Sequence, residues 1–297
     1  MTIRPRRSVL FVPGSNVRAI EKARTLGADC AILDLEDSVA PDAKEAARAQ
    51  VAGAIAARGF GACETIVRIN ALDTPLWVED VNAVVKAKPD ALLLPKVSSP
   101  DQLETMASRL GDIGADHALR VWAMIETPLA ILNAREIAAA VADSETRLSC
   151  LVIGTNDLAK ETRARIVAGR APMQPWLMTC VAAARAHGLD ILDGVYNDLA
   201  DAAGFARECA QARDMGFDGK TIIHPSQIAP CNAAFSPGAH ELAQARAIIA
   251  AFERPENQGK GAIALDGRMV ERLHADMARR TVALAEAIAG RAAPPSS

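Results

Sequence analysis

Aromatic side chains are scarce in this chain of 297 residues, at 3%, and there is no excess of positive charge. The 33 basic and 36 acidic residues give a net charge of −3, and the basic residues are scattered along the sequence. A nucleic-acid-binding surface needs a concentrated positive field. The charge pattern therefore argues against a nucleic-acid partner.

Long apolar segments and paired cysteines are also missing. The N-terminal stretch MTIRPRRSVLFVPG has basic residues, but its apolar run stops at Pro13 and predicts neither a signal peptide nor a membrane span. The cysteines are widely separated and form no C-x-x-C pair: Cys30, Cys63, Cys150, Cys180, Cys209 and Cys231. Such spacing is typical of reduced thiols in the core of a cytosolic protein. We expect a soluble cytoplasmic protein, and the hydrophobic half of the sequence allows a sizeable core.

Short apolar runs alternate with helical patterns as far as about residue 235. The runs lie at 8–12, 30–35, 65–69, 91–94, 120–125, 150–154, 190–193 and 220–224. Alternation of this kind predicts parallel βαβ units, and eight strands close a (β/α)8 TIM barrel. An open doubly wound sheet is the alternative, but VPGSN after the first strand lacks the G-x-G-x-x-G spacing of a dinucleotide site. We predict an α/β barrel over residues 1–235.

Capping signals predict four of the intervening helices. They span 41–59, 73–87 with Thr74 as cap, 126–142 with Thr127 as cap, and 198–216 ending on Gly216. Residues 236–297 differ from the repeating pattern. A helix over 236–253, the polar break RPENQGKG, a short strand or turn and a final helix predict a helical lid or arm that reaches a neighbouring subunit.

Charged or titratable groups stand at the C-terminal ends of most predicted strands. In chain order these are Asp34, Glu36 and Asp37, then Arg68, Lys96, Glu126, Asp157, Asp193 and His224. Helix capping favours Ser, Thr, Asn and Asp, yet Arg, Lys, Glu and His occur here as well. Because a TIM barrel builds its active site from these ends, the variety indicates a polar pocket.

Glu126 and Asp157 follow consecutive strands, which are usually neighbours. Two adjacent carboxylates repel each other unless a proton or a cation lies between them. No His or Cys lies beside either residue, so an all-oxygen Mg²⁺ (or Mn²⁺) site is one interpretation. The other is structural: Glu126 caps the following helix or pairs with Arg68, and Asp157 caps its own helix. Spacing alone leaves both open.

The remaining candidates also have two interpretations. Strand alternation places Arg68 at the barrel mouth, as an ion-pair partner or as a donor to a substrate oxygen. Lys96 is either a solvated rim charge or a contact to an anionic cofactor. Of the carboxylates in LDLEDSV, Asp37 lies in the loop, and at least one of the three has a structural role or holds metal-bound water.

Nine segments, in order along the chain, resemble the citrate lyase β-subunit-like proteins of the HpcH/HpaI aldolase superfamily, CoA-ester lyases that include malyl-CoA lyase. They are VLFVPGSN, AILDLEDSV, VRIN, LLLPKV, MIETPLAI, GTNDLA, DGVYNDLAD, GFDGKTIIHPSQI and ALDGRMVE. The resemblance implies a (β/α)8 barrel with Mg²⁺ held at Glu126 and Asp157, and Arg68 acting on the substrate carbonyl or enolate.

The resemblance also implies contacts from the turn over 154–157 and from the C-terminal extension. Gly154, Thr155 and Asn156 would receive the oxo-acid carboxylate on backbone N–H groups. Asp266 would reach the active site of a neighbouring subunit and serve in acid–base chemistry within a homotrimer or homohexamer.

The leading hypothesis is a Mg²⁺-dependent lyase that cleaves a malyl-CoA-like or citramalyl-CoA-like thioester to an oxo acid and acetyl-CoA. A malyl-CoA thioesterase with the same pocket is a second hypothesis. The third is the β subunit of a citrate lyase, which works with a carrier-protein partner.

Overall fold

The structure is a computed structural model in which residues 3–292 are described. The chain divides into two compact units. The first is Arg6–Phe235, and the second contains the described residues 3–5 and 236–292. Over residues 3–292, no helix has both the length and the apolar character that a membrane span requires.

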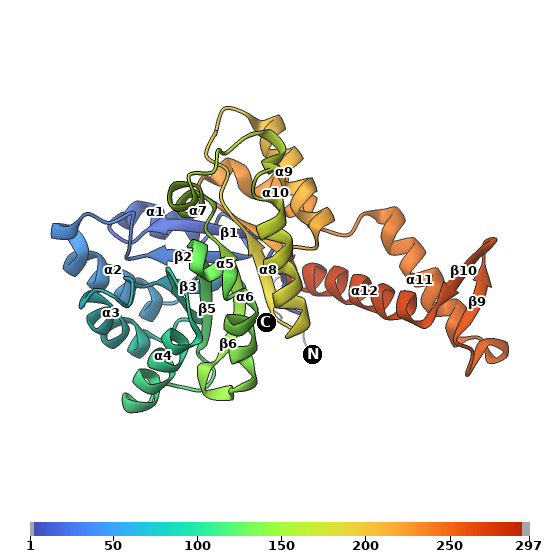
Figure 1. Ribbon diagram of the computed structural model, residues 1–297, viewed down its shortest axis with the longest axis horizontal. Helices are drawn as coiled ribbons and strands as arrows, with labels where there is room; N and C mark the ends of the chain where they lie inside the picture. The colour runs from blue at the N-terminus through green and yellow to red at the C-terminus, as the bar shows by residue number, and fades with distance from the viewer. Residues whose placement is uncertain (1–2, 293–297) are drawn as a thin grey trace. The chain divides into compact units, whose positions relative to one another are not determined.

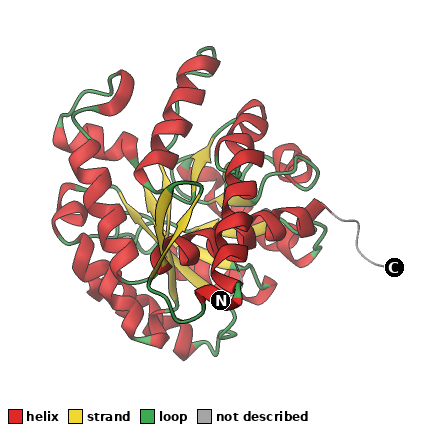
Figure 2. Cartoon of the chain, turned by 90° about the vertical axis from the view of Figure 1, so that its right-hand side faces the viewer, coloured by secondary structure: helices red, strands yellow, loops and turns green. Residues whose placement is uncertain are grey.

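The first unit is a closed barrel of eight parallel strands in sequence order (Figures 1 and 2). The strands are β1 Ser8–Pro13, β2 Cys30–Asp34, β3 Glu64–Arg68, β4 Ala91–Leu94, β5 Arg120–Ile125, β6 Leu148–Ile153, β7 Asp190–Asp193 and β8 Gly219–Ile222. β8 pairs with β1 and closes the ring. The predicted (β/α)8 barrel is confirmed, and each strand lies within two residues of its predicted range.

Helices surround the strands in Figure 2. They are α1 Val17–Ala23, α2 Lys44–Ala56, α3 Leu76–Val84, α4 Pro100–Asp112, α5 Pro128–Leu132, α6 Ala134–Ala139, α7 Thr155–Thr162, α8 Gln174–Ala186, α9 Ala202–Met215 and α10 Ile228–Ala234. Two caps are confirmed: Thr127 Oγ1 accepts a hydrogen bond from the Ala130 N–H at 3.0 Å, and Gly216 ends α9 with φ 95°.

Two helix predictions are wrong in detail. Thr74 does not cap α3, because its hydroxyl donates to the Ala71 carbonyl at 2.9 Å and Pro75 is the cap residue. The helix predicted over 126–142 is two helices, α5 and α6. Asn133 leaves helical geometry between them, and its side-chain amide donates to the Ser98 carbonyl at 2.8 Å.

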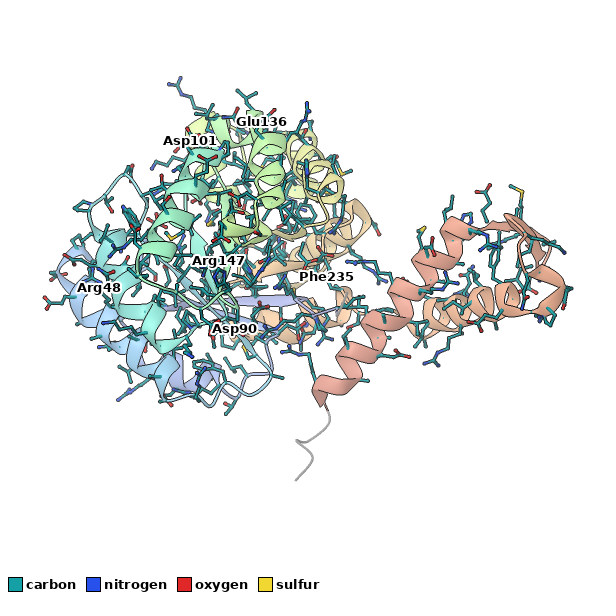
Figure 3. The ribbon with its side chains drawn as sticks, turned by 90° about the horizontal axis from the view of Figure 1, so that it is seen from below. Arg48, Asp90, Asp101, Glu136, Arg147 and Phe235 are labelled. Carbon is teal, nitrogen blue, oxygen red and sulfur yellow. The ribbon has the colours of Figure 1, made fainter. Side chains whose placement is uncertain are left out.

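Apolar side chains fill two layers of this unit. The larger layer lies between the strands and the helices. The smaller layer lies inside the barrel and includes Ile66, Trp122 and Met124. Because strand residues alternate between faces, Arg68 and Glu126 continue the inward faces of β3 and β5. Figure 3 labels Phe235, the buried last residue of the unit.

The second unit contains two helices and a two-stranded hairpin, namely α11 Ala239–Glu253, β9 Ala262–Leu265, β10 Arg268–Glu271 and α12 Arg272–Ala292. Asp266 and Gly267 connect the antiparallel strands, with φ values of 49° and 75°. Asp-Gly with two positive φ angles is the preferred two-residue hairpin turn. Only a short strand or turn was expected here from the sequence, although the Asp-Gly pair between apolar residues is a hairpin signal.

Candidate active site

Arg68 and Asp34 form a buried, two-pronged ion pair at the C-terminal ends of β3 and β2. The two residues are register partners on neighbouring strands. Arg68 Nε and Nη2 donate to the two Asp34 carboxylate oxygens at 2.6 and 2.7 Å. Burial works to raise the pKa of Asp34, but the hydrogen bonds and charge of Arg68 hold it below its ordinary value. The pair locks the guanidinium plane and leaves Nη1 as the nitrogen directed elsewhere.

Glu36 lies between that third nitrogen and Lys96. Arg68 Nη1 is 3.0 Å from Glu36 Oε2, and Lys96 Nζ donates to Glu36 Oε1 at 2.9 Å. Glu36 is 5% exposed, and burial raises the pKa of its carboxyl. The Arg68 guanidinium also stacks over the Phe11 ring at 4.9 Å. The mouth therefore contains two cations that share one carboxylate.

Glu126 is completely buried with only one of its oxygens hydrogen-bonded. Oε1 accepts the Lys96 backbone N–H at 2.8 Å, whereas Oε2 has no hydrogen-bond partner within residues 3–292. Burial, followed by the negative charges of Glu36 and Asp157, raises the pKa of Glu126 to about 8. A carboxylate in this position needs a proton or a cation. The structural alternatives for Glu126 do not hold, because Thr127 caps α5 and Arg68 pairs with Asp34 and Glu36.

Gly154 provides the space that Glu126 occupies. A β-carbon at position 154 would overlap Glu126 Oε2 and lie 2.5 Å from Glu126 Cβ. The Gly154 N–H donates to the Ile125 carbonyl at 3.1 Å, so this amide belongs to the barrel. The next three amides, of Thr155, Asn156 and Asp157, begin α7, where no carbonyl of the helix lies four residues before them. Those three remain the donors suited to an anion.

The side chains of this turn have different surroundings. Asp157 is half-buried in the first turn of α7, and the cap position belongs to Gly154, so Asp157 is not the N-cap. Thr155 is buried against Gly194. Asn156 is exposed and exchanges two amide hydrogen bonds with Asn197, at 2.7 and 3.3 Å. The Asn156 side chain thus connects the first turn of α7 to the β7–α9 loop.

Of the other predicted site residues, Asp37 lies at the mouth and Asp266 belongs to the second unit. The Asp37 side chain is 57% exposed, with Oδ2 3.8 Å from Arg68 Nη1. Asp266 is exposed at the tip of the β9–β10 hairpin. The barrel unit thus brings Arg68, Lys96 and Asp37 together.

Lys44 was not predicted from the sequence. Its ammonium donates to the carbonyls of Leu35 and Glu36 at 2.7 and 2.6 Å and to Asn70 Oδ1 at 2.8 Å. Lys44 therefore fixes the loop that carries Glu36. No local pattern identifies it, because a lysine in the first turn of an amphipathic helix is ordinarily solvated.

Asn70, two residues after Arg68, belongs to a polar network at the helix layer. Its backbone and side-chain N–H groups donate to Asp80 Oδ2 at 2.8 and 2.7 Å. Asp80 also accepts from Arg48 of α2, labelled in Figure 3, at 2.9 Å. Because Asn70 also accepts a hydrogen bond from Lys44, this network helps to fix the loop that follows β2 and carries Glu36.

Two other strand-end residues have structural roles. Asp193 is fully buried, paired with Lys220 at 2.7 Å and with Arg170 at 2.7 Å. Its neighbour Leu192 points into the barrel, so Asp193 faces the helices. His224 caps a short helix through Nδ1, which accepts the Ser226 N–H at 3.2 Å. The expectation that polar strand ends indicate a pocket is therefore wrong for Asp193, whereas His224 has the capping role that is the usual one for such a histidine.

The donor set at the mouth fits a cation that needs few protein ligands. Over residues 3–292, no three His, Cys, Asp or Glu side chains gather as a metal cluster. Mg²⁺ keeps several waters and binds through one or two carboxylates together with substrate oxygens. The unpartnered, buried Oε2 of Glu126 and the nearby Asp157 carboxylate supply such a pair.

Comparison with known proteins finds relatives that match nearly the whole chain. The chain is 50% identical over 285 residues to a (3S)-malyl-CoA thioesterase of Cereibacter sphaeroides (strain KD131 / KCTC 12085), with 96% of each chain covered. It is 32% identical to the mitochondrial citramalyl-CoA lyase of Homo sapiens, covering 96% of this chain and 86% of the relative.

The solved structure of CitE from Mycobacterium tuberculosis in complex with magnesium, acetoacetate and coenzyme A superposes with a TM-score of 0.76 at 32% identity. The match covers 95% of this chain and 98% of that one. The HpcH/HpaI aldolase/citrate lyase family model matches residues 7–225. This chain belongs to the HpcH/HpaI aldolase/citrate lyase family.

Proposed function

We propose that this protein is a Mg²⁺-dependent enzyme acting on malyl-CoA-like thioesters, and that its reaction is hydrolysis to malate and free CoA. The observation that carries the proposal is the buried Glu126 carboxylate with an unpartnered oxygen, next to an arginine locked by Asp34. From the sequence alone, the lyase is the leading hypothesis. We prefer the thioesterase because 50% identity to such an enzyme over 96% of the chain exceeds the 32% identity to the citramalyl-CoA lyase.

Glu126 and Asp157 would hold the cation. When bound, Mg²⁺ would polarise the oxygens of the hydroxy-acid end of the substrate and orient it. Glu126 keeps one oxygen available for the cation. Lys96 donates a hydrogen bond to Oε1 only, and Gly154 has no side chain that would cover Oε2.

The substrate carboxylate would be received by the first-turn amides of α7, at Thr155, Asn156 and Asp157. A helix N-terminus presents N–H donors and a partial positive charge to an anion. Arg68 Nη1 would donate to the thioester oxygen as negative charge develops on it. Asp34 fixes the plane of the guanidinium that carries this donor.

Proton transfer would involve Asp266 from a neighbouring copy of the chain, in a homotrimer or homohexamer. Asp266 is exposed at a hairpin tip, where a carboxylate can be presented to another subunit. In hydrolysis, water adds to the thioester carbonyl, the C–S bond breaks, and the proton from water ends on the thiolate. A carboxylate that accepts and returns that proton completes the step.

C–C cleavage is the second candidate, because the 32% identical citramalyl-CoA lyase shares the full length of the fold. Incubation with (3S)-malyl-CoA and Mg²⁺ separates the two. Hydrolysis yields malate and free thiol in equal amounts. Glyoxylate and acetyl-CoA without free thiol would overturn the thioesterase and establish the lyase.

The carrier-dependent alternative is tested by the same assay. A citrate lyase β subunit of Leuconostoc mesenteroides subsp. cremoris is 34% identical to this chain. Turnover of free CoA thioesters by the purified protein alone would argue against a carrier-protein requirement. Absence of any product from malyl-CoA or citramalyl-CoA would contradict the proposed function.

A further inference from the structure

Lys96 has an uncommon backbone conformation directly after β4. Its φ is 53°, in the left-handed region that non-glycine residues rarely adopt. Lys88 has the same conformation, with φ 59°, but ends a short helix, where such a residue is common. Lys96 follows a strand at the barrel mouth, so helix termination does not account for it.

The backbone of Lys96 is hydrogen-bonded to the buried Glu126 carboxylate. Its N–H donates to Oε1 at 2.8 Å, and Oε2 has no hydrogen bond from the part of the chain that the structure describes. The left-handed backbone of Lys96, directly after β4, thus directs the Lys96 amide at the Glu126 carboxylate, directly after β5. This single donor orients the carboxylate so that Oε2 is the oxygen available to a cation.

The side chain of the same residue points to a second carboxylate. Lys96 Nζ donates to Glu36 Oε1 at 2.9 Å, and Glu36 Oε2 is 3.0 Å from Arg68 Nη1. Without the ammonium, Arg68 would be the remaining cation on Glu36. The lysine therefore reduces the hold of Glu36 on the only Arg68 nitrogen that Asp34 does not take.

We propose that Lys96 is a positioning residue with two separable functions: its backbone N–H aims Glu126 at the cation, and its ammonium restrains Glu36 so that Arg68 Nη1 stays available to the substrate. This inference rests on the proposed function, because it assumes a divalent cation at Glu126.

The backbone function is tested with Lys96→Gly and Lys96→Val. Both remove the ammonium, but glycine adopts a positive φ freely and valine strongly disfavours it. Mn²⁺ binding to metal-stripped full-length protein is measured by calorimetry. We expect Lys96→Gly to bind within about threefold of wild type and Lys96→Val to bind roughly tenfold or more weakly, as for loss of an orienting hydrogen bond at a metal ligand.

Lys88→Gly and Lys88→Val are the matched controls. Lys88 has the same backbone conformation and its side chain is exposed beside Asp116. This pair should show the same difference in melting temperature but no difference in Mn²⁺ affinity. If Lys96→Val does not fold, Lys96→Ala replaces it, because a β-carbon also disfavours the left-handed turn.

The side-chain function is tested with Lys96→Gly and Lys96→Arg. Arginine occurs in the same conformation at Arg58, Arg147 and Arg163, so this backbone accepts it. We expect Lys96→Gly to lower kcat roughly tenfold or more at unchanged Mn²⁺ affinity, and Lys96→Arg to restore most of it.

The outcomes separate the two levels of inference. If wild type does not bind Mn²⁺, the proposed metal site is wrong and this inference is overturned with it. If wild type binds Mn²⁺ but the glycine and valine variants bind equally well, only the backbone function is overturned. Equal kcat in wild type and Lys96→Gly overturns the side-chain function.

Discussion

The absence of a side chain at Gly154 leaves the space that the Glu126 carboxylate fills, because a β-carbon at position 154 would overlap the Glu126 Oε2 atom. Gly154 has a φ of −103°, so its backbone does not require glycine. The reason for glycine at this position is the side chain of the residue that follows β5. The relationship connects a strand-end glycine to the geometry of the proposed metal site.

Gly154→Ala should therefore displace Glu126. We expect a loss of about 1–3 kcal/mol in the free energy of unfolding from overpacking and a weakening of Mn²⁺ binding of roughly tenfold. Denaturant unfolding and Mn²⁺ calorimetry check the two effects. Gly53→Ala is the control, because Gly53 lies in α2 with open space around it and alanine should stabilise the helix by roughly 0.5–1 kcal/mol. Unchanged Mn²⁺ affinity in Gly154→Ala would contradict the assignment of Glu126.

The raised pKa of Glu126 predicts a pH dependence of stability. Between about pH 4.5 and pH 8, the folded metal-free protein keeps a proton on Glu126 that the unfolded chain has released. The folded state binds more protons in this window, so the free energy of unfolding falls as pH rises, by up to about 1.4 kcal/mol per pH unit. Urea unfolding of wild type and Glu126→Gln between pH 4.5 and pH 9 isolates this contribution.

Under saturating Mg²⁺, the pH dependence of the free energy of unfolding should differ less between wild type and Glu126→Gln, because the cation binds the ionised carboxylate. Parallel stability curves without metal would show that Glu126 has an ordinary pKa. Glu126→Gln should also abolish Mg²⁺-dependent turnover while the barrel stays folded, as should Asp157→Asn.

Arg68→Lys should lower kcat/KM by roughly 10²–10³, since lysine cannot keep two hydrogen bonds to Asp34 and also direct a third donor at the substrate. Steady-state kinetics on the thioester measure this. Arg7→Lys is the control: Arg7 holds Asp29 in the same two-pronged geometry, at 2.8 and 2.9 Å, before β1 and β2 begin. Comparable destabilisation of both variants is expected, with activity lost only in Arg68→Lys. Equal activities would remove Arg68 from the mechanism.

Asp266→Asn should lower kcat by roughly 10²–10⁴ without changing the melting temperature. Asparagine tolerates the left-handed turn as aspartate does, so the hairpin persists and only the carboxylate is lost. Asp266→Ala serves as the comparison in which turn strain is added.

Mixing Asp266→Asn with Arg68→Lys tests whether sites are shared between copies. Mixed oligomers should regain part of the activity, because some sites would combine an intact Arg68 with an intact Asp266. Native mass spectrometry verifies subunit exchange. No recovery after verified exchange would place both residues in one chain's site.

The order of strands and helices could be predicted because it depends on local patterns. Apolar runs at 91–94, 120–125 and 190–193 coincide with β4, β5 and β7, and Thr127 caps α5 as expected. Thr74 failed as a cap because its hydroxyl found the Ala71 carbonyl instead. Local propensity does not decide between such competing partners.

The pairing of charges required the tertiary structure. Asp34 and Asp193 both end buried strands, yet Asp34 is the partner of a mouth arginine and Asp193 faces the helices with Lys220. Likewise, no sequence pattern foretells that Lys44 holds the loop carbonyls of Leu35 and Glu36.

The sequence by itself determined the barrel and the order of its eight strands, because the periodicity of apolar residues along the chain specifies these. Only the tertiary structure decided which strand face points inward, which cation meets which carboxylate, and why Gly154 is glycine. Those depend on atoms from different strands meeting in one buried volume, where sterics and desolvation select the partners.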